Sequence, residues 1–311
     1  MINRILLLFL TVWVGTLGVI GCSHFPKNDL WKGYTLTWLG TAGWKVGYRE
    51  KTVLIDPYLS RISGKNSQGK EDWNQIWKSN TESIEFALRK ANISEVDVIL
   101  VSHSHFDHFG DVPYLLKKFP NAIVYGSSTT CNILAAVAPM GKCVDVSKET
   151  LVHLPNLSIK AVPTLHSFAG PDQKLPFAGK ISTPPKSPLK ISDYVEGGST
   201  MFYLQGEGID FLFQGSANFI ESEMDALHPK TAVIATVLYK NVDHYQVRLL
   251  GKLHPRNIIL NHFDNFFLPY SAGMLPLDEK ELNQFITELR EFDSTIDLTV
   301  PQFFQEIKIE D

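Results

Sequence analysis

The feature that most constrains this chain is a short string with four side chains that can bind a metal ion. His103, His105, Asp107 and His108 lie in the string HSHFDH, which follows the predicted buried strand at residues 96–101. Neutral imidazole and carboxylate are ligands that zinc and iron accept. A regular helix or strand would scatter these side chains over several faces, whereas a loop after a buried strand can turn them inward together. The string therefore predicts a metal site at a strand end.

The string resembles the H-x-H-x-D-H motif of the metallo-β-lactamase superfamily. Residues 38–43 (WLGTAG) and 55–58 (IDPY) are similar to the opening of the branch that includes L-ascorbate-6-phosphate lactonases and N-acyl-phosphatidylethanolamine phospholipase D. Downstream, His166 and His262 each follow a predicted strand, as the isolated histidines of this family do. The resemblance spans residues 34–264 and implies the α/β class, with a four-layer αββα sandwich and a metal centre at one edge.

Carried over by position, the resemblance implies that this chain binds two metal ions. The first would be held by His103, His105 and His166, and the second by Asp107, His108 and His262. Zinc is the expected metal, with manganese or iron as alternatives. Asp107 would also take part in catalysis as a base. Asp56 ends a predicted strand and is expected to orient the site from behind the ligands.

One position departs from the family pattern. The carboxylate that bridges two metal ions normally follows a strand and a glycine, but here Ser216 follows Gly215. A neutral hydroxyl is a poorer ligand for a dication and supplies no charge to hold two cations close together. Ser216 is therefore expected to be at most a weak ligand, so that the second ion binds less firmly. A metal-binding descendant without catalysis is the alternative.

The N-terminus differs in character from the rest of the chain. A short basic start is followed by an apolar run that ends in the string VIGC at residues 19–22. This pattern resembles a bacterial lipoprotein, with residues 1–21 as the signal peptide, Cys22 as the lipidated residue and residues 22–33 as a tether. Ser23, where aspartate would indicate retention, favours the outer membrane in a double-membrane bacterium. An uncleaved membrane span is the alternative, although the run barely reaches the ~18 residues that a span needs.

The remaining residues, 34–311, are expected to form one domain, although the chain exceeds the usual size of a single core. The composition is 44% hydrophobic and 20% charged, which favours a packed globular domain over a disordered one. The net charge of −4 and the lack of a basic stripe give no reason to expect nucleic acid as a partner. A small-molecule or lipid-like substrate is expected, and the oligomeric state is left open.

Hydrophobic patterns predict strands and helices that alternate along the chain. Strands are predicted at residues 34–39, 44–48, 52–55, 96–101, 122–125, 157–162, 200–205, 209–214, 232–238 and 257–261. Helices are predicted at residues 83–91, from Asp111 with Pro113 onward, and at residues 278–292. The two halves have a similar order of elements, which fits two sheets packed face to face with helices outside.

Three segments without a motif border the predicted site and would set its specificity: residues 60–80, 168–198 and 263–275. In the first, Trp73 and Trp77 lie four residues apart, which favours a short helix that packs both indoles over a lid that faces the substrate. The second is long and rich in glycine and proline, which is typical of a lid or binding loop. Aromatic residues of the third either form an apolar wall of the site or pack under the C-terminal helix.

His244 and two cysteines have no settled role at this stage. His244 lies in a predicted loop and is a candidate catalytic residue that orients the substrate, with a plain surface histidine as the alternative. Cys131 and Cys143 would either pair in an oxidising compartment or stay as two buried thiols.

Together these features predict an exported, membrane-anchored, metal-dependent hydrolase. Activated water would cleave an ester, lactone or phosphodiester bond, in a substrate that the anchor suggests is lipid-like. Two other classes stay open: an iron-dependent oxidative member of the superfamily and a binding lipoprotein without turnover. Nucleases are disfavoured because no added basic domain is evident. β-Lactamases proper are disfavoured because they lack the signatures at residues 38–43 and 55–58.

Overall fold

The first half of the chain builds a seven-stranded sheet in the order β14-β1-β2-β3-β4-β5-β6. Strands β1 to β3 pair antiparallel, whereas helices separate β3 to β6, which pair in parallel. The last strand of the chain, β14, pairs with β1. The bounds are Tyr34–Gly40 (β1), Gly43–Tyr48 (β2), Lys51–Ile55 (β3), Val98–Leu100 (β4), Ile123–Gly126 (β5), Lys142–Asp145 (β6) and Glu306–Ile309 (β14).

The second half repeats this scheme in a sheet of order β13-β12-β11-β10-β9-β8-β7. Strands β7 to β10 pair antiparallel, and β10 to β13 pair in parallel. The bounds are Leu151–Leu154 (β7), Leu157–Pro163 (β8), Thr200–Gly206 (β9), Ile209–Phe213 (β10), Thr231–Ala235 (β11), Asn257–Asn261 (β12) and Asp297–Thr299 (β13). The similar order of elements in the two halves of the sequence thus corresponds to two similarly built sheets.

This computed structural model describes residues 34–309 apart from residues 49, 148–150, 155 and 207–208. The predicted signal peptide, Cys22 and the tether lie outside the described residues. Within the described part of the chain, no helix is both long and apolar enough to cross a membrane.

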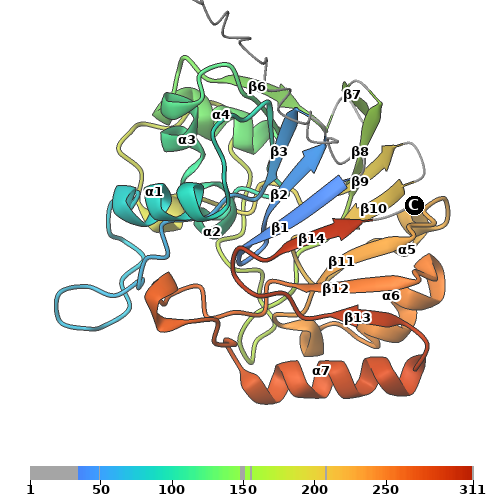
Figure 1. Cartoon of the computed structure of the whole chain (residues 1–311). Helices are drawn as coiled ribbons and strands as arrows, with labels where there is room; N and C mark the ends of the chain where they lie inside the picture. The colour runs from blue at the N-terminus through green and yellow to red at the C-terminus, as the bar shows by residue number, and fades with distance from the viewer. Residues whose placement is uncertain (1–33, 49, 148–150, 155, 207–208, 310–311) are drawn as a thin grey trace, which may run out of the picture. The chain divides into compact units, whose positions relative to one another are not determined.

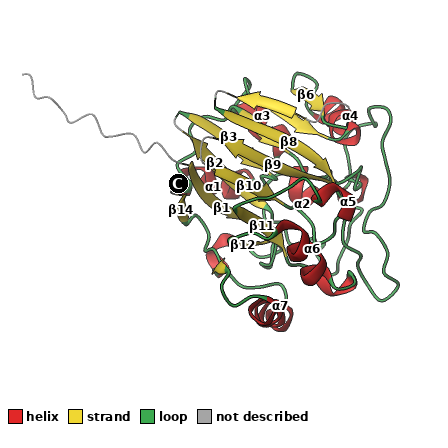
Figure 2. Ribbon diagram, turned by 90° about the vertical axis from the view of Figure 1, so that its right-hand side faces the viewer, coloured by secondary structure: helices red, strands yellow, loops and turns green. Residues whose placement is uncertain are grey.

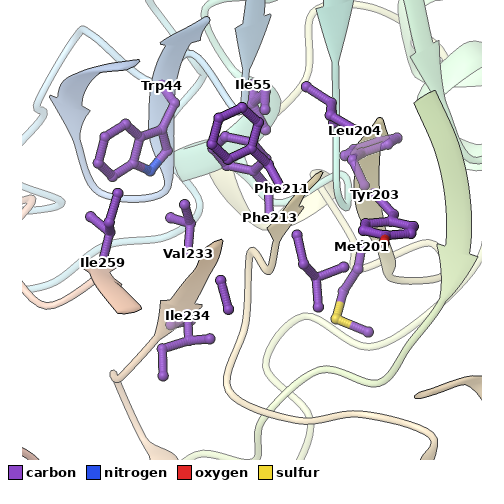
Figure 3. Packing of buried hydrophobic residues seen from close by; sticks show 14 of the residues in the cluster. Trp44, Ile55, Met201, Tyr203, Leu204, Phe211, Phe213, Val233, Ile234 and Ile259 are labelled. Carbon is purple, nitrogen blue, oxygen red and sulfur yellow. The ribbon is translucent and has the colours of Figure 1, made fainter. Parts of the chain in front are cut away.

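The two sheets pack face to face through large apolar side chains. Trp44 and Ile55 of the first sheet lie opposite Phe213 and Val233 of the second, as Figure 3 shows. Each of the four is at most 2% exposed. Burying a side chain of this kind contributes about 1.5–3 kcal/mol, so this layer holds the two sheets, and with them their strand ends, together.

Helices cover the outer faces of both sheets (Figure 1), and the layers can be followed from the side in Figure 2. The cluster under α1 to α4 forms a second apolar core on the first sheet, while α6 and α7 pack on the other sheet. The bounds are Thr81–Lys90 (α1), Phe106–Phe109 (α2), Val112–Lys118 (α3), Ser128–Val137 (α4), Glu221–Met224 (α5), Tyr245–Leu253 (α6) and Glu279–Phe292 (α7). The four-layer αββα sandwich implied by the resemblance is therefore present.

All of the predicted strands and helices exist, with ends shifted by a few residues. The sequence missed four helices, α2, α4, α5 and α6, and four short strands, β6, β7, β13 and β14, because their apolar patterns are short. Asp111 precedes α3 as predicted, but its carboxylate does not cap the helix. It accepts hydrogen bonds from the backbone N–H groups of Leu59 and Ser60 at 2.8 and 2.7 Å instead.

The prediction of a short helix around Trp73 and Trp77 is wrong, since residues 60–80 contain no helical turn. The indoles are held by aromatic neighbours from other segments: Trp73 contacts Phe177 and Trp77 contacts Tyr194. Tertiary packing has therefore replaced the local helix.

Cys131 of α4 and Cys143 of β6 form a disulfide in the structure. Of the two states that the sequence left open, the structure therefore contains the paired one. The bond joins a helix to the edge strand of the first sheet and closes a loop with a sequence separation of 12 residues.

Candidate metal centre

The HSHFDH string lies where β4 ends, and two phenylalanines set its shape. Strand β4 ends at Leu100, and α2 begins at Phe106 with His105 as its N-cap residue. Phe106 and Phe109 are buried in the apolar core under α1 to α4. Because these rings occupy the apolar side of the turn, its polar side chains are directed to the other side.

The structure brings together all six residues that the resemblance assigned to two metal ions. The first ligand group consists of His103, His105 and His166, and the second ligand group consists of Asp107, His108 and His262. Within each group the potential ligand atoms lie within 4.8 Å of one another. The isolated histidines reach the string because β8 and β12 end at the same edge of the sandwich as β4.

In the first ligand group, two imidazoles are oriented by backbone carbonyls. His105 Nε2 lies 3.0 Å from the carbonyl oxygen of Pro176, and His166 Nδ1 lies 2.6 Å from that of Ser167. A carbonyl oxygen only accepts hydrogen bonds, so these outer nitrogens carry the proton. The other nitrogen of each neutral ring therefore presents a lone pair.

His103 is oriented in the same sense by a hydroxyl. Ser102 donates its proton to Asp56 Oδ2 at 2.5 Å, so its oxygen accepts from His103 Nδ1 at 3.1 Å. His103 Nε2 then lies 3.1 Å from His105 Nδ1, and each of these two nitrogens carries a lone pair. Two lone pairs at this distance repel unless a cation lies between them. Two nitrogens bound tetrahedrally to one zinc ion would be about 3.3 Å apart, so the pair fits a metal ion.

Burial keeps the imidazoles of the first ligand group neutral. It lowers the pKa of His103 well below its ordinary value, that of His105 to about 3 and that of His166 to about 4. Neighbouring histidines lower these pKa values further. Neutral imidazole is the form that binds metal, so no proton has to be removed first near neutral pH.

The second ligand group differs because it contains a carboxylate. Asp107 Oδ2 lies 3.4 Å from His262 Nε2 and 3.7 Å from His108 Nε2. Burial raises the pKa of Asp107, but His108 and His262 outweigh burial and hold this pKa below its usual range. Asp107 is therefore ionised and supplies one negative charge.

A second carboxylate stands behind His108. Asp56 Oδ2 lies 2.9 Å from His108 Nδ1, and Asp56 Oδ1 accepts a bond from the Ser102 backbone N–H at 2.6 Å. Burial lowers the pKa of His108, but Asp56 and Asp107 outweigh it, so that pKa is raised. Asp56 thus occupies the supporting position that the sequence predicted, with its carboxylate directed at a ligand rather than into the group.

His262 is placed by the turn at residues 38–43. Its backbone N–H donates to the carbonyl of Thr41 at 2.9 Å, and the Thr41 N–H donates to Asp264 Oδ1 at 2.8 Å. Asp264 also pairs with the buried Arg61 at 2.8 Å. Gly40 has a φ of +93°, and a Cβ there would lie 2.6 Å from the Arg61 guanidinium. This packing explains why a glycine stands in the turn.

The ring of His262 has one unmatched atom. Its Nδ1 is buried and has no hydrogen-bond partner among the described residues. A cation at Nε2 would leave this Nδ1 as the proton-bearing nitrogen.

Ser216, the residue found where the resemblance implies a bridging carboxylate, lines the site. Its Oγ accepts a bond from the Ser167 N–H at 3.0 Å and lies 3.0 Å from the Ser167 hydroxyl. The hydroxyl is therefore tied to the residue that follows His166, on the side of the first ligand group. Its role as a weak ligand stays a prediction.

A cavity of about 320 Å³ opens onto both ligand groups. It is lined by Trp73, His105, Phe106, Asp107, His166, Ser167, Ala169, Pro176, Phe177, Ser216, Val237, Leu238, His262, Phe266, Phe267 and Leu277. Of the aromatics after His262, two take the first of the roles left open by the sequence, and two others pack on rings outside the C-terminal helix. Phe266 and Phe267 form a wall of the cavity, whereas Phe263 stacks on Trp38 and Tyr270 packs on Phe303.

The structure does not bring His244 to this cavity. His244 precedes α6, its side chain is 72% exposed, and its Nδ1 lies 2.7 Å from the neighbouring Asp243. It borders a separate surface groove with Tyr239 and Glu288. These contacts are those of a surface histidine and give no support to a substrate-orienting role.

Several residues that shape the site were not found from the sequence. Pro176 supplies the carbonyl that orients His105, and Glu196 accepts the Ser104 N–H through its backbone oxygen at 3.0 Å. The buried carboxylate of Glu196 closes the same loop by accepting the Gly198 N–H at 2.8 Å. Both residues lie in the loop at 168–198, where no periodicity or motif marks them.

Comparisons with known proteins agree with this geometry. The family model described as metallo-beta-lactamase superfamily matches residues 37–140, which include the HSHFDH string. A protein of Anaeromyxobacter dehalogenans named UPF0173 metal-dependent hydrolase is 26% identical over 257 residues, covering 76% of this chain and 77% of that protein.

Solved structures extend the likeness to most of the chain. Igni18, a metallo hydrolase from Ignicoccus hospitalis, covers 89% of this chain and 99% of its own, with a TM-score of 0.57 and 17% identity. CmlA, a diiron beta-hydroxylase from Streptomyces venezuelae, covers 89% of this chain and 54% of its own, with a TM-score of 0.53 and 12% identity. At these identities the likeness establishes the fold, and proteins with this fold carry out different reactions.

Proposed function

We propose that this chain, a metal-dependent hydrolase of the metallo-β-lactamase superfamily, cleaves an ester, lactone or phosphodiester bond of a small or lipid-like molecule. The observation that carries this proposal is the position of the two ligand groups. Their donor atoms converge at the base of one cavity, with Asp107, His105, His166 and His262 on its surface.

The donor set favours zinc over magnesium or calcium. Five imidazoles and one carboxylate make up the two groups, and imidazole suits zinc and iron, whereas magnesium, calcium and manganese are better held by carboxylate, carbonyl and water oxygens. Metal ions held there would polarise the oxygen of the scissile bond and lower the pKa of a water molecule.

The residues of the chain divide the remaining tasks. Asp107, ionised and reachable from the cavity, accepts a proton from the attacking water. The hydrogen bonds from His105 and His166 to backbone carbonyls, and from His108 to Asp56, keep the rings in one orientation. When the C–O bond of an ester breaks, the leaving alkoxide takes the proton held by Asp107 and departs as the alcohol, while the second proton of the water stays on the acid.

The proposal is tested with the full-length chain purified in detergent. It is assayed on an uncharged ester, a lactone and a phosphodiester, first after chelation and then after zinc, manganese or iron is restored. Restored turnover of one bond type is the expected result. His105→Ala should abolish it, whereas His153→Ala, at an exposed position of β7, should not. Stoichiometric metal binding with no turnover of any bond type would contradict the proposal.

We further propose that the chain is an exported lipoprotein whose Cys22 carries the anchor, which would place the cavity near a membrane. Support comes from the apolar run and the VIGC string at residues 19–22. Cys22→Ala should block lipidation and cleavage, so that the protein accumulates as an uncleaved precursor, detected by its larger mass. A mature-sized, membrane-bound variant would contradict this assignment.

A further inference from the structure

The walls of the cavity are strongly biased in chemistry. Its ionisable lining residues, within the described part of the chain, are Asp107 and the three histidines of the ligand groups, and no lysine or arginine is among them. The rest of the wall is dominated by large apolar side chains: Trp73, Phe106, Phe177, Val237, Leu238, Phe266, Phe267 and Leu277. A phosphate or carboxylate away from the reacting bond would thus find no side-chain cation, and burying such a charge without a partner is unfavourable.

The aromatic part of the wall is built in advance by two loops that are joined through their backbones. The Ser192 N–H donates to the carbonyl of Trp73 at 2.9 Å, and the Trp77 N–H donates to that of Leu189 at 2.8 Å. Gly64, with a φ of +65°, leaves room for the Trp73 ring, since a Cβ there would lie 2.7 Å from it. The segments at 60–80 and 168–198 therefore form a fixed roof over the cavity.

Trp73 lies at the centre of this roof. Its ring centroid is 5.8 Å from that of Phe106, 5.9 Å from that of Phe177 and 5.9 Å from that of Phe267. Aromatic rings at such distances and angles form a stable cluster that accepts another ring or a compact apolar group.

The aromatic cluster is continuous with the ligand groups. The Phe177 ring lies edge-on to His105 at 5.8 Å, and the Phe266 ring lies edge-on to His262 at 5.3 Å. In a substrate whose scissile bond lies at the ligand groups, the apolar group next to that bond would therefore lie against the aromatic cluster. The volume of about 320 Å³ is at the small end for ligand sites, which limits this group to roughly the size of one ring.

We propose that the substrate is an uncharged ester or lactone whose acyl side carries an aryl or similarly compact apolar group, and that Trp73 is the residue that selects this group. This inference rests on the proposed hydrolase function and specifies its substrate class. The geometry that carries it is a preformed aromatic roof without a lysine or arginine, placed directly against the two ligand groups.

The test compares substrates that share one leaving group. Ethyl phenylacetate, ethyl acetate and monoethyl succinate differ only in an aryl, small or anionic acyl side. We expect kcat/KM for the aryl ester to exceed the other two by at least about tenfold. Trp73→Ala should lower this preference on the order of tenfold, mainly by raising KM for the aryl ester. Phe292→Ala, at a partly exposed position of α7, should leave the preference unchanged.

A binding measurement separates this inference from the proposed function. Calorimetry with phenylacetamide, an uncharged analogue, should show binding to the wild-type chain that Trp73→Ala weakens on the order of tenfold, at unchanged metal content and in a variant that is still folded at the assay temperature. If no substrate is hydrolysed but phenylacetamide binding depends on Trp73, the proposed function fails and the inference on the cavity stands. Preference for the anionic ester or for a phosphodiester, or an unchanged preference in Trp73→Ala, would overturn the inference.

Discussion

The two ligand groups lie side by side but differ in where their charge resides. The first group is made of neutral imidazoles, and two of them are oriented by backbone carbonyls, those of Pro176 and Ser167. The second group contains the ionised Asp107, and a further carboxylate, Asp56, supports His108. A dication in the second group therefore meets compensating charge, whereas one in the first group meets only dipoles.

This difference changes the meaning of Ser216. From the sequence alone, the missing bridging acid was expected to weaken the binding of the second metal ion. In the structure the Ser216 hydroxyl is tied to Ser167, next to His166 of the first ligand group. The negative charge that a bridging carboxylate would supply is therefore missing mainly from the first ligand group, which contains no carboxylate. We therefore expect the second ligand group to bind its ion more tightly.

The largest effect should follow from removing the charge of the second group. Asp107→Asn keeps the size of the side chain but should lower kcat/KM on the order of a thousandfold, because several kcal/mol of charge stabilisation are lost. Asp243→Asn, at an exposed carboxylate next to His244, is the control and should have wild-type activity. Activity within tenfold of wild type in Asp107→Asn would show that the charge asymmetry does not govern catalysis.

A smaller effect should follow from removing the charge behind the ligand. Asp56→Asn should weaken binding of the tighter ion by about 10–100-fold, measured by competition with a chelator. Asp111→Asn removes another buried carboxylate that contacts Leu59 and Ser60 but no histidine. It should lower the melting temperature and leave metal affinity unchanged. Equal losses of metal affinity in both variants would show that the effect comes from destabilisation of the whole fold and not from the contact between Asp56 and His108.

The difference in charge between the two ligand groups should be reduced by introducing the acid that the resemblance led us to expect at Ser216. Ser216→Asp adds a carboxylate beside the first ligand group and should raise the metal-to-protein ratio from about one to about two. Ser216→Ala should leave the ratio at about one. Elemental analysis of the purified proteins provides the measurement, and a ratio of two in the unaltered chain would contradict the expected weakness of the first group.

The smallest effect concerns the metal-free protein in mild acid. The pKa of His105 is about 3 and that of His166 about 4 in the folded chain, against about 6.5 in the unfolded chain. Between these values the unfolded chain binds more protons, so stability is fully present above about pH 6.5 and lost as the pH falls. The melting temperature of chelated protein should fall by several degrees between about pH 7 and about pH 5. An equally steep fall in His105→Gln would contradict this assignment.

The sequence predicted the main elements well where the pattern was long. The strands that carry the ligands, β4, β8 and β12, are apolar runs followed by histidine, and α7 has a clear amphipathic period. The helix expected around Trp73 was wrong because both indoles are held by rings from distant segments. His244 was misplaced as a site candidate because nothing local distinguishes a surface loop from one that reaches the cavity.

What the sequence by itself determined is the set of potential ligands and the kind of fold, since the HSHFDH string and the two later histidines after predicted strands resemble a single superfamily. Only the tertiary structure decided which nitrogen of each ring faces inward, on which side Ser216 lies, and which aromatics form the cavity wall. These features depend on contacts between residues far apart in the chain, such as His105 with Pro176 and Thr41 with Asp264. Local patterns specify strand ends, but the relation between strand ends is fixed only when the two sheets pack.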